Sequence, residues 1–238
     1  MSDPRERAKE AAGRQAAAYV RDGMKVGLGT GSTVHYTILA LGERHLDITC
    51  VATSARTAAL ATELKLTVVE PDRALALDIA IDGADEVDAR FNLIKGGGGA
   101  HLREKIVATM ARRFIVVVDE AKLVDTLGAF GLPLEVLDFA PAVVAAQLRA
   151  LGARAVTTRA ARSDNGNLLM DAAFERITDP AGLAAALAAL PGIVEHGLFL
   201  APMVERVVVA GTAGVRELVR PPRSATPLGK RGQGGFPN

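Results

Sequence analysis

The first 120 residues alternate between helical and strand-like patterns of hydrophobic positions. Small apolar residues recur at helical spacing over residues 5–20, and Gly23 follows where such a helix would stop. Apolar runs then predict strands at residues 25–29, 48–53, 66–70, 77–82 and 114–119, with helices at 34–41 and 55–64. Apolar strands separated by helices are typical of a parallel sheet that is covered on both faces. The pattern therefore predicts an α/β fold with an open, mostly parallel sheet.

The pattern changes after Gly131. Strand-like runs occupy residues 132–139, 154–159 and 167–174, and helical runs occupy 142–151 and 180–190. Asp164-Asn165-Gly166 separates two of the strands, and Asn-Gly between strand-like runs is a strong hairpin signal because both residues tolerate a positive φ. These residues predict a smaller α+β lobe.

The remaining segments suggest how the chain is divided. Residues 204–210 are very apolar and are expected to return to the first sheet, followed by a short final helix at 215–219. Residues 221–238 combine four Pro, four Gly and three basic residues with no acid, which predicts a disordered tail. We expect an α/β catalytic domain at 1–131 and 204–220, a small lobe at 132–203, and the tail.

Composition narrows the classes of partner and cofactor. The 238 residues hold 28 basic and 27 acidic side chains, so no overall charge draws the protein to nucleic acid or an anionic membrane. The single Cys50 cannot form an internal disulfide, and the four histidines lie too far apart for a metal-ligand spacing. No signal-peptide pattern or long apolar run is present. We predict a cytoplasmic protein with no structural metal.

A glycine-rich loop, Gly27-Leu28-Gly29-Thr30-Gly31-Ser32-Thr33, joins the first predicted strand to its helix. Such a loop offers unobstructed N–H groups, hydroxyls and a helix N-terminus to an anion. The dinucleotide interpretation is weaker, because the motif needs glycine where Ser32 stands and an acid where the second strand ends in Thr53-Ser54. The loop predicts a phosphate site, with an ordinary turn as the alternative.

An acidic segment follows the strand that ends at Asp82. It holds four carboxylates in seven residues, Asp82, Asp85, Glu86 and Asp88. A calcium loop would need a longer series of ligands. A solvated acidic turn is the simple alternative, but Asp82 ends an apolar strand at the sheet edge where the glycine-rich loop is expected.

The third candidate segment begins with Lys95 and four consecutive glycines, which are costly in chain entropy unless something approaches the backbone closely. A helix is predicted from about Ala100. Its stripe of Leu102, Ile106 and Met110 is expected to pack inward, which would turn Glu104 toward a cleft. Glu104 could also simply favour the helix dipole. His101 is interpreted as a surface or packing residue.

Together these segments resemble ribose-5-phosphate isomerases of the A type. The resemblance rests on Gly-Leu-Gly-Thr-Gly-Ser-Thr, Asp-Gly-Ala-Asp-Glu and Lys-Gly-Gly-Gly-Gly-Ala-His-Leu-Arg-Glu-Lys-Ile, and it continues through Leu-Pro-Leu-Glu-Val and Pro-Gly-Ile-Val-Glu-His-Gly. It covers residues 5 to 220 in order. It implies an aldose–ketose isomerase of the pentose phosphate pathway that needs no metal or nucleotide cofactor and forms a homodimer.

The resemblance also implies roles for individual residues. Glu104 is the expected base, which carries a proton between neighbouring carbons through a cis-enediolate. Asp82 would handle the oxygen-bound proton, and Lys95 would stabilise the enediolate charge. The remaining substrate-binding positions are Thr30, Gly31, Ser32, Thr33, Gly83, Ala84, Asp85, Gly96, Gly97, Gly98, Lys122 and Lys9.

Two rival functions make different predictions. A nucleotide-dependent dehydrogenase would use the first loop for pyrophosphate, but that loop lacks the third glycine and the strand-end acid. A non-catalytic sugar-phosphate sensor of the same architecture would bind without turnover. Glu104 has no evident purpose in a protein that only binds the sugar phosphate.

Overall fold

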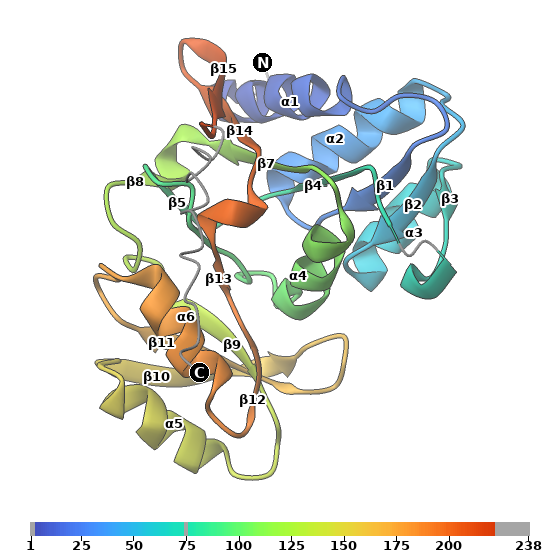
Figure 1. The fold of residues 1–238 in the computed structure, drawn as a ribbon. Helices are drawn as coiled ribbons and strands as arrows, with labels where there is room; N and C mark the ends of the chain where they lie inside the picture. Colours follow the sequence, from blue (N-terminus) through green and yellow to red (C-terminus); the bar gives the residue numbers. More distant parts are fainter. Residues whose placement is uncertain (1–2, 74–75, 222–238) are drawn as a thin grey trace, which may run out of the picture.

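A seven-stranded sheet forms the larger part of the molecule (Figure 1). The computed structural model describes residues 3–73 and 76–221. The strands, in the spatial order β15-β14-β7-β4-β1-β2-β3, are β15 (Gly214–Val219), β14 (Arg206–Gly211), β7 (Phe114–Asp119), β4 (Ile79–Asp82), β1 (Lys25–Leu28), β2 (Thr49–Ala52) and β3 (Thr67–Val68). Every neighbouring pair is parallel except β14 with β15. The predicted open, mostly parallel sheet is confirmed.

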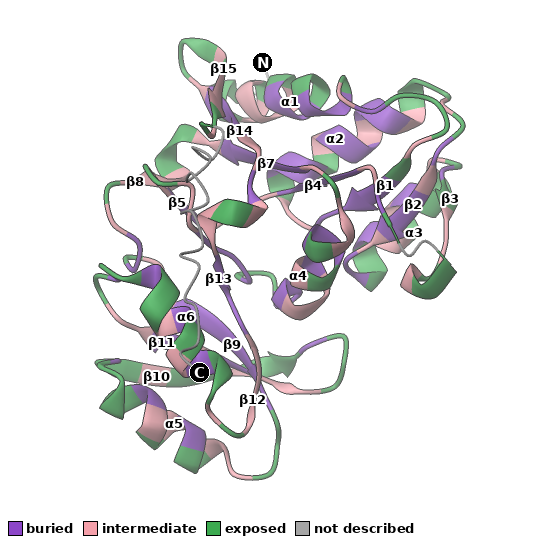
Figure 2. Ribbon diagram, viewed as in Figure 1, coloured by how far each residue is buried: buried purple, intermediate pink, exposed green. Residues whose placement is uncertain are grey.

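Helices cover both faces of this sheet, because alternate residues of each buried strand enter different cores. In β7, which is buried (Figure 2), Ile115 and Val117 join one core, while Val116 joins the other. Helices α1 (Pro4–Ala17), α2 (Ser32–Glu43) and α3 (Ala55–Glu63) contribute to the first core, and α4 (His101–Met110) contributes to the second. Burial on both faces explains why the strands are continuously apolar.

A second sheet lies below the first in Figure 1 and is antiparallel. Its order is β10 (Ala155–Arg162), β11 (Leu168–Ala173), β9 (Leu132–Val136) and β12 (Ile193–His196). Helices α5 (Pro141–Ala150) and α6 (Pro180–Ala188) pack on it through Leu148 and Leu187. Gly166 has a φ of +85° in the tight turn between β10 and β11, as the Asn-Gly pair predicts.

A third, very small sheet was not predicted. It has the order β13 (Leu198–Phe199), β6 (Leu93–Ile94), β5 (Glu86–Asp88) and β8 (Leu123–Val124). Two- and three-residue strands have no recognisable alternation, so sequence patterns miss them. The antiparallel pair β5–β6 turns the chain back on itself after Asp82 and returns Lys95 to the edge of the main sheet.

Two predictions about the C-terminal region have different outcomes. Residues 204–210 do return to the main sheet as β14, beside β7. The predicted final helix at 215–219 is wrong, because these residues form β15, paired antiparallel with β14. Gly214, with a φ of +116°, closes the tight turn, and β-branched Val215 and Val219 suit a half-buried edge strand. The predicted disordered tail falls on residues 222–238, outside the described residues, apart from Pro221.

Candidate active site

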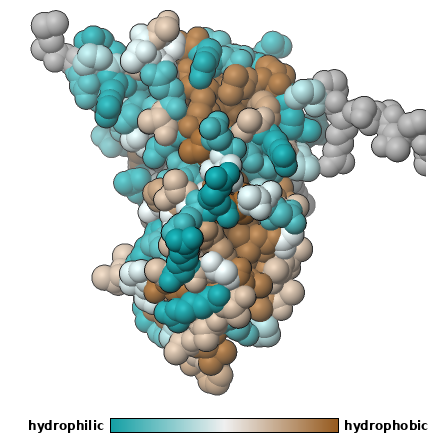
Figure 3. Space-filling model, turned by 90° about the vertical axis from the view of Figure 1, so that its left-hand side faces the viewer, coloured by the Kyte–Doolittle hydropathy of each residue, from teal (hydrophilic) through white to brown (hydrophobic). Residues whose placement is uncertain are grey.

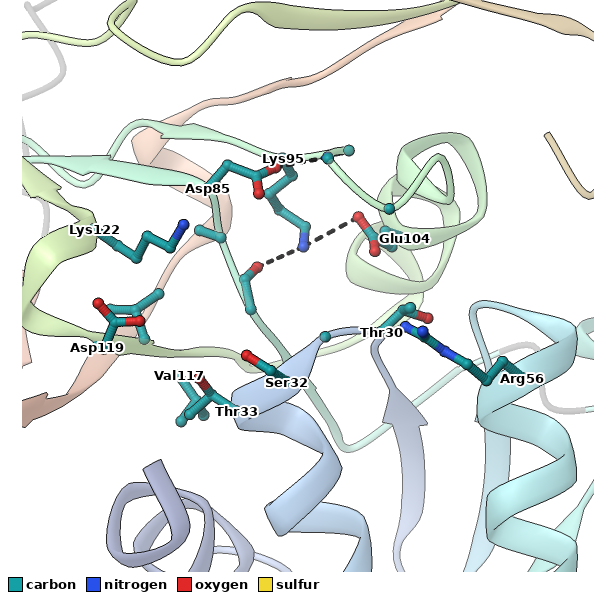
Figure 4. Close-up of a pocket in the computed structure, with 17 residues that line it drawn as sticks. Thr30, Ser32, Thr33, Arg56, Asp85, Lys95, Glu104, Val117, Asp119 and Lys122 are labelled. Carbon is teal, nitrogen blue, oxygen red and sulfur yellow. Dashed lines mark hydrogen bonds and ion pairs between the residues drawn. The ribbon is translucent and has the colours of Figure 1, made fainter. Parts of the chain in front are cut away.

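A pocket of about 150 Å³ opens at the carboxyl edge of the main sheet, where β1, β4 and β7 end (Figure 4). Ligands of open α/β sheets bind at this edge. The pocket gathers the three predicted segments together with the segment after β7. Its lining residues are Thr30, Gly31, Ser32, Thr33, Arg56, Gly83, Ala84, Asp85, Lys95, Gly96, Gly97, Gly98, Glu104, Val117, Val118, Asp119 and Lys122.

Lys95 lies at the centre of the site and is only 2% exposed. Its Nζ is 3.1 Å from Glu104 Oε2 (Figure 4) and 3.0 Å from Asp82 Oδ2, and it donates a hydrogen bond of 2.5 Å to the Gly83 carbonyl. The ammonium thus forms ion pairs with two carboxylates and a hydrogen bond with one carbonyl. One buried cation therefore holds two buried carboxylates from different segments.

Asp82 contacts Lys95 but is not among the residues that line the pocket. Its Oδ1 accepts backbone hydrogen bonds from Thr30 (3.0 Å) and Gly83 (2.7 Å). A Cβ on Gly29 would stand 2.0 Å from Asp82 Oδ1, so only glycine lets the loop pass this carboxylate. Asp82 thus anchors the glycine-rich loop to the end of β4.

The two carboxylates are not equivalent. Glu104 Oε2 receives no hydrogen bond from the described residues, whereas Asp82 has two backbone donors. Burial raises the pKa of Glu104 to about 8, and the charges of Asp82 and Asp85 add to this, while Lys95 opposes it. Burial also raises the pKa of Asp82, against Lys95 and the two N–H groups. Because Asp82 is better solvated by donors, Glu104 is the carboxyl that gains and loses a proton near neutral pH.

Lys95 itself remains charged. Burial alone would lower its pKa, but the charges of Asp82 and Glu104 outweigh burial and raise the pKa of Lys95 to about 12. With Glu104 protonated the three groups carry no net charge, and with Glu104 ionised they carry one negative charge. A buried carboxyl with a pKa near working pH is suited to accept and return a proton.

The loop before α2 is fixed by a group of hydroxyls. Thr30 Oγ1 lies 2.8 Å from Ser54 Oγ and 3.0 Å from the hydroxyls of Thr53 and Thr57. Ser54 also caps α3 by accepting from the Thr57 N–H. The end of β2 has no acid for a dinucleotide ribose, and instead its Thr53 and Ser54 hydroxyls hold the glycine-rich loop at Thr30. This role was not predicted from the sequence. Ser32 and Thr33 are left facing the pocket at the start of α2 (Figure 4).

The acidic segment is not a solvated turn. Asp85 accepts a 2.7 Å hydrogen bond from Gly97 N–H, and a Cβ on Gly97 would lie 2.6 Å from the Asp85 carboxylate. Glu86 is buried and accepts from the N–H groups of Gly128 and Phe130. Asp85 therefore secures the glycine loop of the pocket, and Glu86 secures the loop at residues 128–130.

The predicted packing face of α4 is wrong. Ile106 is 46% exposed, whereas His101, Glu104 and Val107 are buried. The helix turns this face inward because it lies beneath the glycine loop, where a Cβ on Gly96 would meet the His101 ring. His101 is a packing residue, and burial lowers its pKa to about 4, so its ring is neutral. Glu104 reaches the pocket from the buried side of the helix.

Of the two further lysines predicted to bind substrate, Lys122 and Lys9, one lies at the pocket and the other does not. Lys122 lines the pocket after β7. Lys9 is not among the lining residues; its Nζ is 2.9 Å from Glu6 Oε1 on the same helix. Arg56, at the start of α3, lines the pocket but was not predicted, because a single arginine in a helical pattern carries no local signal.

Two further features bear on partners and cofactors. Within residues 3–73 and 76–221, no three His, Cys, Asp or Glu side chains are grouped so that they could hold a metal ion. No helix in this part of the chain has the length and hydrophobicity to cross a membrane.

Comparison with known proteins agrees with this geometry. The family model described as ribose 5-phosphate isomerase A (phosphoriboisomerase A) matches residues 49–214. A ribose-5-phosphate isomerase A of Thermomicrobium roseum is 50% identical over 225 residues, covering 90% of this chain and 94% of the relative.

Solved structures give the same result. A D-ribose-5-phosphate isomerase in complex with phospho-erythronic acid aligns with a TM-score of 0.87 at 39% identity, covering 90% of this chain and 99% of that one. The ribose 5-phosphate isomerase A of Methanocaldococcus jannaschii aligns with a TM-score of 0.85 at 38% identity, with the same coverage. On the strength of sequence, fold and site together, this chain belongs to the ribose 5-phosphate isomerase A family.

Proposed function

We infer that this protein is an aldose–ketose isomerase that interconverts D-ribose 5-phosphate and D-ribulose 5-phosphate. The observation that carries the assignment is the position of Glu104, a buried carboxyl with a pKa near 8 that faces a pocket beside an anion-binding loop. Proton transfer between adjacent carbons of an anionic sugar needs these two features side by side.

In the proposed mechanism, ionised Glu104 removes the proton from C2 of the open-chain aldose. The electron pair of that C–H bond forms the C1–C2 double bond of a cis-enediolate, and O1 takes up negative charge. Glu104 then returns its proton to C1, while the hydroxyl proton moves from O2 to O1. Proton transfer on one face of the substrate needs only one base.

Asp82 and Lys95 support this base. Lys95 lines the pocket and touches both carboxylates, whereas Asp82 does not line it. We therefore propose that Asp82 acts through Lys95, as a positioning residue and as the reservoir for the oxygen-bound proton. Lys95 keeps the ionised form of Glu104 accessible near neutral pH.

The phosphate is assigned to the other end of the pocket. Ser32 and Thr33 offer hydroxyls at the N-terminus of α2, and Lys122 offers an ammonium (Figure 4). A helix N-terminus favours a dianion. Binding energy from the phosphate, remote from C1 and C2, holds those carbons against Glu104.

Three further proposals concern the compartment, the division of the chain into lobes, and association. We propose that the chain acts in the cytoplasm, that residues 132–203 form a lobe separate from the catalytic domain at 1–131 and 204–220, and that two chains associate. Exposed apolar side chains support association, notably Phe139 at 95% and Val143 at 56%. Hydrophobic side chains also reach the surface on the face drawn in Figure 3. Sedimentation of the purified protein tests association directly.

The direct test is an assay of the purified protein with ribose 5-phosphate. We expect formation of ribulose 5-phosphate and incorporation of solvent deuterium at the substrate carbon during turnover. Binding of the sugar phosphate without turnover would instead identify a sensor of the same architecture, and would remove the proposed function.

A further inference from the structure

Arg56 is a cation on the pocket wall that none of the preceding steps uses. Its guanidinium makes no hydrogen bond or ion pair with any residue in the described parts of the chain. The acidic side chains near the pocket already have partners other than Arg56. Asp82 and Glu104 both contact Lys95, and Asp85 accepts a hydrogen bond from the Gly97 N–H. An arginine has five N–H donors, so Arg56 brings the largest unused set of donors to the pocket.

The location of Arg56 is unfavourable for the helix that carries it. It is the second residue of α3, and a positive charge in the first turn opposes the helix dipole. The backbone there is nonetheless held firmly, since Ser54 caps the helix and the Ala55 N–H donates to Asp164 of the second sheet at 3.0 Å. Helix stability therefore does not explain this arginine.

Figure 4 shows which part of the pocket Arg56 faces. Its guanidinium points toward Thr30, on the same side as Glu104, while Lys122 and Asp119 lie on the opposite side. Under the proposed function the phosphate occupies the Lys122 side. The carbons that react then lie beside Glu104, which puts their oxygens on the Arg56 side of the pocket.

Negative charge that develops on the substrate oxygens O1 and O2 is stabilised by hydrogen-bond donors. O1 and O2 gain negative charge as the enediolate forms, and donors already in place lower the energy of that state. Lys95 Nζ already lies within ion-pair distance of Asp82 and Glu104 and donates a hydrogen bond to the Gly83 carbonyl. Any contact from Lys95 to the substrate competes with these partners, whereas Arg56 has no such partner in the described residues.

We propose that Arg56 is a catalytic residue that donates hydrogen bonds to O1 and O2 of the substrate as they become the oxygens of the enediolate. This inference rests on the proposed isomerase function. It assigns an oxyanion donor that lies on a different helix from the base and on the opposite side of the pocket from the phosphate lysine.

The test compares Arg56→Ala, Arg56→Lys and the control Arg149→Ala, which removes an exposed arginine from α5. For Arg56→Ala we expect kcat to fall by about 10–10²-fold, with KM changed by less than about threefold, because the interaction strengthens in the transition state. Arg56→Lys should recover part of the loss, since it keeps the charge but not the planar donors. Arg149→Ala should match the unaltered protein.

Two inhibitors distinguish the ends of the pocket. 4-Phospho-erythronate carries two oxygens on its terminal carbon, as the enediolate presents two oxygens at its end, and Arg56→Ala should weaken its inhibition at least about tenfold. Inhibition by inorganic phosphate, which tests the Lys122 end, should change less than about twofold. The Tm of Arg56→Ala should be unchanged or slightly higher, because the substitution removes a positive charge from the N-terminal turn of α3, where that charge opposes the helix dipole.

The outcomes separate this inference from the function beneath it. Normal kcat and normal 4-phospho-erythronate inhibition in Arg56→Ala would overturn the role of Arg56 and leave the isomerase assignment intact. Equal weakening of both inhibitors would place Arg56 at the phosphate and would also overturn it. Absence of ribose 5-phosphate turnover in the unaltered protein would remove the proposed function itself.

Discussion

Two lysines, the buried Lys95 and the partly buried Lys105, contact the same aromatic ring, yet their pKa values are shifted in opposite directions. Lys95 Nζ and Lys105 Nζ lie 5.3 and 5.0 Å from the centre of the Phe199 ring. Lys95 contacts two carboxylates, Asp82 and Glu104. Lys105 contacts one carboxylate, Glu195 at 2.6 Å, and also donates to the backbone carbonyl of His196.

The pKa shifts follow the number of carboxylates. Burial lowers the pKa of Lys105, and its single partner Glu195 only partly opposes this. For Lys95, the two carboxylates outweigh burial and raise the pKa to about 12. Burial alone would raise the pKa of Glu195, but Lys105 and a backbone donor outweigh burial and lower it. The pKa of Glu104 is raised to about 8.

The difference shows how similar residues give either a structural or a reactive site. One ammonium per carboxylate leaves both groups charged, which makes the Lys105 cluster a fixed connection between α4 and β12. Two carboxylates per ammonium leave one carboxyl with a proton that it releases near neutral pH. Lys95 and Glu104 of the second cluster line the pocket.

The largest effect is expected from replacing the base. Glu104→Gln keeps size and polarity but removes proton transfer, so kcat with ribose 5-phosphate should fall by about 10²–10⁴-fold. Substrate affinity should change little, and solvent deuterium exchange should disappear with turnover. Glu195→Gln, the same substitution in the other cluster, should retain kcat within about tenfold. Near-normal turnover in Glu104→Gln would move the base to another residue.

The pH profile tests the raised pKa of Glu104. Only the ionised carboxylate accepts a proton, so kcat/KM should rise with pH and level off above about 8. Below that value it should fall by about tenfold per pH unit. The residual activity of Glu104→Gln should lack this dependence. A profile already level at pH 5–6 would mean that Glu104 ionises like an ordinary glutamate.

Thermal stability should respond with opposite signs to the same substitution in the two clusters. Glu104 has a folded pKa above its unfolded value of 4.5, so its contribution is complete below 4.5 and is lost as pH rises toward 8. Glu195 has a lowered folded pKa, so its contribution is present above 4.5 and is lost at lower pH. At pH 8, Glu104→Gln should raise Tm and Glu195→Gln should lower it, each by a few degrees, in calorimetry. The same sign for both variants would contradict the comparison.

The smallest effect is expected from chelation. We predict that excess EDTA leaves kcat and KM unchanged, because side chains of the protein carry out every step of the proposed mechanism. The control is assay of the same preparation with added Mg²⁺ or Zn²⁺. Loss of turnover on chelation, restored by a divalent ion, would require a different mechanism.

Much of the fold could be predicted from the sequence because strands and helices leave periodic patterns. The main sheet, the Asn165-Gly166 hairpin and the return of residues 204–210 all follow from such patterns. The third sheet does not, since its two- and three-residue strands show no alternation, and β15 does not, since Val215, Leu218 and Val219 recur at helical spacing although they form a hairpin strand with β14. The buried face of α4 was mispredicted. The stripe of Leu102, Ile106 and Met110 suggested one face, but the packing of the glycine loop against His101 buries another.

The candidate site shows the same division. Its glycine loops, Asp82, Lys95 and Glu104 were recognisable because each lies in a distinctive local motif beside a strand end. Arg56 and the hydroxyls of Ser54 and Thr57 were not, because each is an ordinary residue at a helix start and becomes functional only through its neighbours. Lys9 is the converse case, a predicted residue that pairs with Glu6 outside the pocket.

Sequence patterns were enough to indicate the family, the alternating strands and helices of the main sheet, and the glycine-rich loop and Asp82 at its carboxyl edge. These depend on short-range periodicity and on backbone positions that only glycine tolerates. The tertiary structure decided that Asp82 and Glu104 share one ammonium, that Glu104 reaches the pocket from the buried side of α4, and that Arg56 faces the same space. Burial and distance set a pKa, and neither exists until residues far apart in the chain are brought together.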